Sequence, residues 1–379
     1  MEKRDSGISS GLLCLTALGL VFLQNGRSCI PKISELSGPI SRITNVPVWV
    51  GVWILLVLIG YRVGCGFFTS RYILYGDDEL KIRKFFRFYL GRLVRMAPLY
   101  YVYCFLFEIF SGNFYFLQNR KQLIEVLTFL YTGNEGVDGI CHLWLVSLLM
   151  QTYLIMPFIY VLIFELKKKK VPLIATYGIV TVAGFCVRAV FMSRGCDWYA
   201  NNYTIFLANV DLVFVGMLVA EIRSTFSVHL KKPTLYKIGM ALLLVVLTVY
   251  IGYLSVGMTE AQFRTYTCLV PTAYAVICGL LLLLSGSGRT VTAGSLLYRL
   301  INWLCGHTYS FYIFHVAVLL YLKEWMTQNE WFVRASAEKQ CVSFFLIGAL
   351  CTLVIAVLFN WIGKRIDEAY TRLERKVFH

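Results

Sequence analysis

Long apolar segments alternate with short polar ones along the whole chain. Ten of them approach the length of about 20 residues that an α-helix needs to cross a bilayer. They lie at residues 11–25, 47–68, 97–117, 143–165, 171–192, 204–222, 238–256, 267–285, 301–322 and 341–363. The first is the shortest. The pattern predicts an all-α, polytopic membrane helical bundle of about ten transmembrane helices. Because no long polar insertion interrupts it, we expect residues 1–379 to form a single integral-membrane domain with no appended soluble domain.

Composition excludes the main alternatives to a membrane protein. Residues of the AVILMFWYC group make up 58% of the chain and charged residues only 15%, and the mean hydropathy is +0.66. Soluble domains are less apolar and more highly charged than this, and monomers avoid exposing large apolar patches. Disordered chains are poorer still in apolar residues. The chain is therefore expected to be neither a soluble globular protein nor disordered.

The net charge of +15, from 36 Lys and Arg against 21 Asp and Glu, indicates how the chain is oriented in the membrane. Cytoplasmic loops of membrane proteins are enriched in Lys and Arg. When both termini are placed in the cytoplasm, most basic residues fall in loops on the cytoplasmic side. This arrangement explains the basic charge without a nucleic-acid partner, so we expect both termini to be cytoplasmic.

Two ionisable residues fall inside consecutive predicted spans. Arg188 lies near the outer end of the fifth and Asp211 inside the sixth. Charged groups within a membrane are costly and often functional. One interpretation is a polar cavity wall that binds substrate, and the other is a structural ion pair that locks two helices.

A basic and aromatic segment precedes the third span. Lys84, Arg87, Arg92 and Arg95 recur there with aromatic residues between them, as in an amphipathic helix on the cytoplasmic interface. Such a helix can be held by anionic lipid. Alternatively, it can form a cradle for a phosphate-rich cytoplasmic ligand.

Two of the five histidines fall where chemistry is possible. His142 begins the fourth span on the outer side, and His315 lies toward the middle of the ninth. Histidine suits proton transfer near neutral pH, although a histidine in a span can also be a packing residue with a hydrogen bond. The sequence has no HExxH metal site, P-loop, GxSxG or GxGxxG motif, so we expect no metal.

Three stretches together resemble the acyltransferase-3 family of polytopic membrane acyltransferases. Residues 88–100, FYLGRLVRMAPLY, are similar to the family stretch FxxRRxxRIxPxY that leads into the third span. Residues 142–147, HLWLVS, continuing to Gln151, Tyr153 and Pro157, are similar to its HLWFLS span. Residues 306–315, GHTYSFYIFH, are similar to its LGxxSYxxYLxH span. The three occur in the family's order, spacing and orientation.

The resemblance implies an integral-membrane O-acyltransferase, and we expect it to act in a bacterial cytoplasmic membrane. Its donor would be acyl-CoA, with acetyl-CoA the first candidate, engaged from the cytoplasm. Its acceptor would be a hydroxyl of a surface polysaccharide or lipid-linked glycan, in keeping with O-acetylation of the cell envelope. Membrane lipids and the glycan are thus the expected partners.

The expected site residues combine the resemblance with the patterns above. The basic entrance of the third span would bind the CoA phosphates through Arg92 and Arg95, with Arg83 and Arg87 beside them. The catalytic candidates are His142 and His315. The substrate-binding candidates are Trp144, Arg188 and Asp211.

One departure from the family concerns its first span, which carries an Arg and, eleven positions later, a His regarded as catalytic. The aligned positions here are Leu13 and Gln24. Glutamine cannot take a proton from a sugar hydroxyl, so another residue must supply the base, and His142 and His315 are the candidates. The alternative is a catalytically inactive relative that binds or translocates a lipid-linked or acyl ligand.

Overall fold

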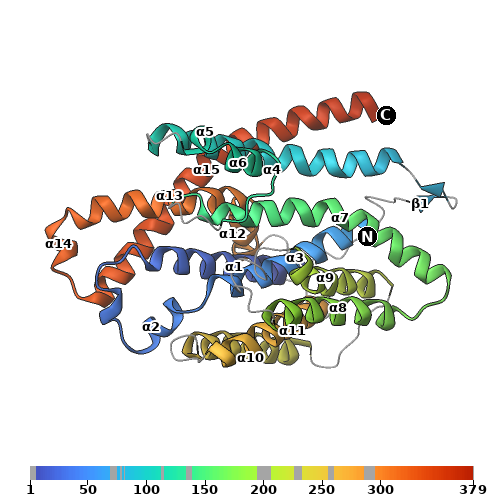
Figure 1. The fold of residues 1–379 in the computed structure, drawn as a ribbon, viewed down its shortest axis with the longest axis horizontal. Coiled ribbons are helices and arrows are strands. Elements are labelled where there is room, and N and C mark those ends of the chain that lie inside the picture. The colour runs from blue at the N-terminus through green and yellow to red at the C-terminus, as the bar shows by residue number, and fades with distance from the viewer. Residues whose placement is uncertain are drawn as a thin grey trace. The chain divides into compact units, whose positions relative to one another are not determined.

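A computed structural model describes residues 6–68, 75–76, 79–80, 82–111, 115–133, 139–193, 206–225, 233–254, 260–285 and 295–378. Helices dominate these residues (Figure 1). The longer helices are α1 Ser6–Arg27, α3 Val48–Phe68, α4 Ile82–Ser111, α7 Trp144–Lys168, α8 Leu173–Ser193, α9 Phe206–Thr225, α10 Pro233–Leu254, α11 Glu260–Leu284, α12 Leu296–Cys305, α13 Thr308–Thr327 and α15 Ala337–Phe378. The short elements are η1 Ile33–Glu35, α2 Gly38–Thr44, β1 Tyr75–Gly76, β2 Glu79–Leu80, α5 Tyr115–Gln118, α6 Arg120–Leu127, η2 Cys141–Leu143 and α14 Glu330–Val333.

The predicted all-α membrane class is confirmed, but the count of ten spans is not. Within the described residues, seven helices are long and apolar enough to cross a membrane, and eight if α12 and α13 form one broken span. The other two expected spans are also helical. However, α9 carries Asp211, Glu221 and Arg223, and the apolar part of α11 is the shorter stretch Cys268–Leu284. The first helix is longer than its predicted run of 11–25, because residues 6–10 precede the run and Gly26 and Arg27 follow it.

Tertiary contacts divide the chain into two compact units. Unit 1 comprises Met1–Arg27, Leu36–Ile73 and Tyr160–Gly306, and unit 2 comprises Ser28–Glu35, Leu74–Ile159 and His307–His379. Unit 1 therefore holds α1, α3 and α8 to α12. Unit 2 holds α4 to α6, most of α7, and α13 to α15.

Glycines bring α3 and α9 into backbone contact within unit 1 (Figure 1). A Cβ atom added at Gly60 would lie 2.0 Å from the Val213 carbonyl oxygen, and one at Gly216 would lie 2.1 Å from that of Val57. Close approach through small residues is a usual way for membrane helices to associate, because lipid supplies no hydrophobic drive between them. Only glycine fits at these two positions.

Arg188 of α8 and Asp211 of α9 form a buried ion pair in unit 1. Arg188 Nη1 and Nη2 donate to Asp211 Oδ1 and Oδ2 at 2.7 and 2.8 Å. Arg188 also donates to the Ala208 and Cys268 carbonyls and to the Thr272 hydroxyl, and that hydroxyl donates to Asp211. These bonds give each guanidinium nitrogen its partners. The arrangement favours the structural interpretation of the pair.

In unit 2, α4 packs beside α13 and α15 (Figure 1). The Tyr309 hydroxyl of α13 donates to the Met96 carbonyl of α4 at 2.7 Å. The rings of Phe314 in α13 and Phe359 in α15 stack with centroids 4.2 Å apart. These contacts position the histidine-bearing helix α13 against α4.

We expect removal of one partner of the Arg188–Asp211 pair to destabilise the protein strongly. Asp211→Ala leaves a buried guanidinium without its counter-charge, at a cost of about 3–5 kcal/mol. The double variant Arg188→Met/Asp211→Leu removes both charges and should lose less than either single change. Chemical unfolding in mixed micelles measures all three. A single variant as stable as the wild type would contradict the structural role.

We also expect Gly60→Ala to disrupt the α3–α9 contact, because its Cβ would overlap the Val213 carbonyl. Gly178→Ala in α8 is the matched control, since nothing lies within 4 Å of its added Cβ, and alanine favours the helix by about 1 kcal/mol. Thermal unfolding in detergent should show a lower midpoint for Gly60→Ala only. Equal midpoints for the two variants would argue against the tight contact.

Candidate functional site

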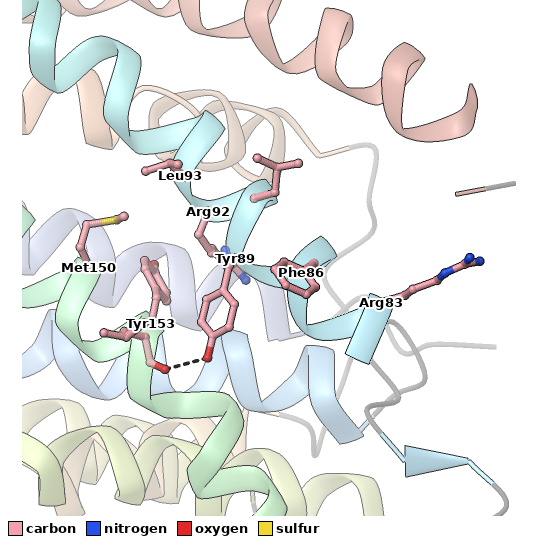
Figure 2. Close-up of a pocket in the computed structure, with 9 residues that line it drawn as sticks. Arg83, Phe86, Tyr89, Arg92, Leu93, Met150 and Tyr153 are labelled. Atoms are coloured by element: carbon pink, nitrogen blue, oxygen red, sulfur yellow. Dashed lines mark hydrogen bonds between the residues drawn. The ribbon is translucent and has the colours of Figure 1, made fainter. Parts of the chain in front are cut away.

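The basic half of α4 forms one wall of a pocket in unit 2 (Figure 2). The pocket has a volume of about 550 Å³. Residues of α4 and α7 line it: Arg83, Phe86, Tyr89, Leu90, Arg92, Leu93, Met150, Tyr153 and Leu154. The Tyr89 hydroxyl donates to the Leu154 carbonyl at 2.8 Å, which ties the two helices together. The pocket surface is therefore mostly aromatic and aliphatic, and Arg83 and Arg92 are its two cationic lining residues.

Arg92 is the most distinctive residue of this pocket. Its guanidinium carbon lies 5.2 Å from the centroid of the Phe88 ring and 4.9 Å from that of Tyr153, within the range of cation–π attraction. Its Nε is buried and makes no hydrogen bond within the described part of the chain. The aromatic rings hold the guanidinium in place while leaving it able to bind an anion.

The other three predicted arginines do not join Arg92 as one cradle. Arg83 lines the pocket, but its side chain extends away from the other labelled residues (Figure 2). Arg87 and Arg95 are not among the lining residues, and Arg95 Nε donates to Asp367 Oδ1 of α15 at 2.9 Å. The structure thus places two of the four at the pocket, and only Arg92 is fixed there by aromatic rings.

The two candidate catalytic histidines meet in the interior of unit 2. His142, in the 3-10 turn that begins α7, is 3% exposed, and His315 of α13 is fully buried. Their ring centroids are 5.1 Å apart with the rings nearly perpendicular. Residues far apart in the sequence therefore form one pair.

Backbone carbonyls of α13 fix the tautomers of both rings. His142 Nε2 lies 2.9 Å from the Ile313 carbonyl oxygen, and His315 Nδ1 lies 2.5 Å from that of Tyr312. A carbonyl can only accept, so these two nitrogens carry protons in the neutral rings. The lone pairs then lie on His142 Nδ1 and His315 Nε2. His142 Nδ1 is buried and has no hydrogen-bond partner among the described residues, so it can accept a proton.

Two tyrosines hold His142 in position. The Tyr312 hydroxyl donates to the His142 carbonyl. The Tyr103 ring packs edge-on against the His142 ring with centroids 5.4 Å apart, and its hydroxyl donates to the Gly139 carbonyl. Gly139 has φ +98°, a backbone conformation that glycine adopts readily. The turn before α7 is therefore fixed by side chains from both α4 and α13.

The remaining predicted residues lie outside this pair. Trp144 is buried, and a Cβ added at Gly133 would lie 3.1 Å from its ring, so it packs against the loop before α7. Arg188 and Asp211 belong to the satisfied network of unit 1. A substrate role for these three residues stays a prediction.

Gln24 of α1 has a structural contact. When the side-chain amide is turned so that its nitrogen faces the end of α2, this nitrogen donates to the Val46 carbonyl oxygen at 3.0 Å and to the Thr44 carbonyl oxygen at 3.2 Å. Leu13 is buried in the core of unit 1. Both side chains have packing or capping partners suited to their chemistry, and neither supplies a base.

Several residues that contact the site were not predicted from the sequence. Tyr312 stands inside the third motif, so its position was a usable signal. Tyr103 and Asp367 carry no local pattern that marks them, because their roles come from contacts between distant helices. Within the described residues, no group of three or more His, Cys, Asp and Glu side chains is arranged to hold a metal ion.

Comparison with known proteins gives one match. The acyltransferase-3 family, described as an acyltransferase domain, matches residues 36–361. No curated protein and no solved structure matches the chain. The family match begins after α1, so Leu13 and Gln24 lie outside it. Because the match covers most of the chain, and because the described helices include seven or eight able to span a membrane, the chain belongs to the acyltransferase-3 family of membrane acyltransferases.

Proposed function

We propose that the protein transfers an acyl group from acyl-CoA to a hydroxyl of a surface polysaccharide or lipid-linked glycan. Acetyl-CoA is the first donor to test. The observation that carries the proposal is the buried, unpartnered Nδ1 of His142, beside His315 and with its tautomer fixed by the Ile313 carbonyl. A free lone pair on a histidine of fixed tautomer is one requirement of a general base.

The pocket between α4 and α7 supports the donor side of the proposal. CoA carries phosphates and an adenine ring. The Arg92 guanidinium suits a phosphate through charge-assisted, bidentate bonds, and the aromatic walls suit a flat base. On α4, Arg92 and Tyr103 are eleven residues apart, about 16 Å at the helical rise. The pantetheine arm of CoA would have to cover this separation to bring the thioester to the histidine pair.

The reaction follows from the tautomers. His142 Nδ1 takes the proton of the acceptor hydroxyl as its oxygen attacks the thioester carbonyl. The carbon–sulfur bond then breaks, an ester forms, and the proton passes to the CoA thiolate. One of the rings packed on His142 has to move before the acceptor can contact Nδ1, because that atom is buried. The His315 ring packs against the His142 ring, with centroids 5.1 Å apart.

The proposal is tested with purified protein in proteoliposomes, radiolabelled acetyl-CoA and glycan extracted from the host. We expect His142→Gln to lower kcat by about 10²–10⁴-fold, the usual contribution of a general base, with little change in the KM for the donor. His307→Gln is the matched control, because His307 caps α13 in the same unit. His315→Gln shows whether the pair shares the role.

An unchanged kcat in His142→Gln would exclude His142 as the base. If the wild type transfers nothing, and Leu13→Arg/Gln24→His creates activity, the chain is instead a catalytically inactive relative. Elution profiles in detergent must match the wild type for each variant compared.

A second variant tests the donor site. Arg92→Gln removes the guanidinium held over Phe88 and Tyr153, and a hydrogen bond to a charged group contributes about 1.5–3 kcal/mol. We therefore expect the KM for acyl-CoA to rise about 10–100-fold, with a smaller effect on kcat. Arg334→Gln is the control, since Arg334 pairs with Glu330 at the surface of α14. Equal KM values for the two variants would rule out Arg92 as the phosphate ligand.

A further inference from the structure

A second cavity in unit 2 lies along the opposite half of α4 from the Arg92 pocket. Its volume is about 940 Å³, and α4, α13 and α15 line it. The walls are mostly aromatic and aliphatic, and include Phe107, Phe110, Phe314, Ile355 and Phe359. We call this cavity the apolar groove.

The apolar groove is adjacent to the histidine pair. Tyr103 and Phe314 line it, and their ring centroids are 5.4 Å apart. The Tyr103 ring also packs against the His142 ring, 5.4 Å away, and Phe314 directly precedes His315. A single aromatic ring therefore separates the groove from the base assigned above.

We propose that the apolar groove binds the hydrocarbon chain of the acyl group being transferred. The inference rests on the proposed function, and it extends the acyl group beyond acetyl to a longer aliphatic chain. Along α13 the groove reaches from Phe314 to Trp325, about 16 Å at the helical rise, several times the length of an acetyl group. Apolar walls of this kind stabilise a chain by about 0.8 kcal/mol for each buried CH₂.

The position of the groove favours the acyl chain over other hydrocarbon. In an acyl donor the chain begins at the reacting carbonyl carbon, so it must lie next to the base. In a lipid-linked glycan a phosphate and sugars separate the hydrocarbon from the reacting hydroxyl. Hydrocarbon of that kind bound beside His142 would hold its hydroxyl far from the base.

The far end of the groove limits the acyl class further. Glu324 and Ser111 are the polar residues there, at the ends of α13 and α4. A carboxylate at the end of an acyl chain would meet the Glu324 carboxylate, and like charges repel. The groove therefore fits a neutral aliphatic acyl group and disfavours a dicarboxylic one.

A native cysteine reports on occupancy. Cys351 lines the groove and is exposed, and Cys186 is exposed on α8, outside the groove. We expect decanoyl-CoA, at about ten times its Kd, to slow labelling of Cys351 by a membrane-permeant maleimide about tenfold. Acetyl-CoA and free CoA should leave Cys351 labelling unchanged, and Cys186 should label equally throughout. Peptide mass spectrometry separates the two sites.

A filled groove provides the functional test. Ile355→Trp places an indole in the groove, whereas Val354→Trp, at a neighbouring exposed position outside the lining, is the matched control. We expect Ile355→Trp to lower the ratio of kcat/KM for decanoyl-CoA over acetyl-CoA at least tenfold, the scale on which apolar pockets discriminate by size. Val354→Trp should leave this ratio at the wild-type value.

The outcomes separate the groove from the proposed function. Protection of Cys351 by decanoyl-CoA without transfer from any donor would uphold the groove and overturn the acyltransferase proposal. Transfer with no preference for chain length, and no protection, would overturn the groove alone. Equal protection by dioleoylphosphatidylglycerol, or protection by decanoyl-CoA that survives in Ile355→Trp, would also overturn it, because the site would then be a lipid or surface effect.

Discussion

Polar groups inside a bilayer have no water to bind, so each must find a partner within the protein. This constraint accounts for most polar contacts of the structure. Arg188 is satisfied by a carboxylate, two carbonyls and a hydroxyl, and Gln24 by two carbonyls at the end of α2. Glu108 of α4 accepts from the Phe116 backbone with one oxygen. Such residues resemble catalytic groups in a sequence, and the bonds of Arg188 and Gln24 favour a structural interpretation of both.

The exceptions to the constraint are therefore informative. Arg92 Nε and His142 Nδ1 are two of several buried polar atoms without a hydrogen-bond partner among the described residues; others include the second oxygen of Glu108 and the side-chain amide of Gln122. Arg92 lies in a pocket and His142 beside a second histidine, so each has the surroundings of a ligand site. For Glu108 and Gln122 the structure offers no pocket or matching group, and we assign them no role.

The sequence predicted helices better than it predicted contacts between them. Each of the ten apolar runs falls on helix in the described part of the chain, and the ninth covers both α12 and α13, because burial in lipid requires continuous apolar surface. Fewer helices than expected are apolar enough to span a membrane. Helix α9 is not among them because it carries Asp211, Glu221 and Arg223, and it packs in the protein interior instead. Arg188 and Asp211 could be paired in advance because their helices are consecutive.

The histidine pair, the Arg95–Asp367 ion pair and the apolar groove depend on how helices far apart in the sequence pack against one another. His142 and His315 were separate candidates, and their contact follows only from the packing of the α7 start against α13. The sequence predicts an anionic lipid or phosphate ligand for the basic face of α4, but Asp367, 272 residues from Arg95, binds Arg95. No local pattern encodes that ion pair. The apolar groove likewise exists only between α4 and the much later helices α13 and α15.

The two histidines take their proton arrangement from main-chain carbonyls at positions 312 and 313. Every amino acid carries such a carbonyl, so the choice of protonated nitrogen does not depend on which side chains occupy those positions. For His142 it depends on the rotation and height of α13 relative to the turn before α7, whereas His315 binds a carbonyl three residues earlier in its own helix. Substitutions at 313 could therefore accumulate during evolution without changing the tautomer of His142, whereas Tyr312 is constrained because its hydroxyl also binds the His142 carbonyl. An insertion or deletion of one residue between Thr308 and Ile313 would displace the Ile313 carbonyl from His142.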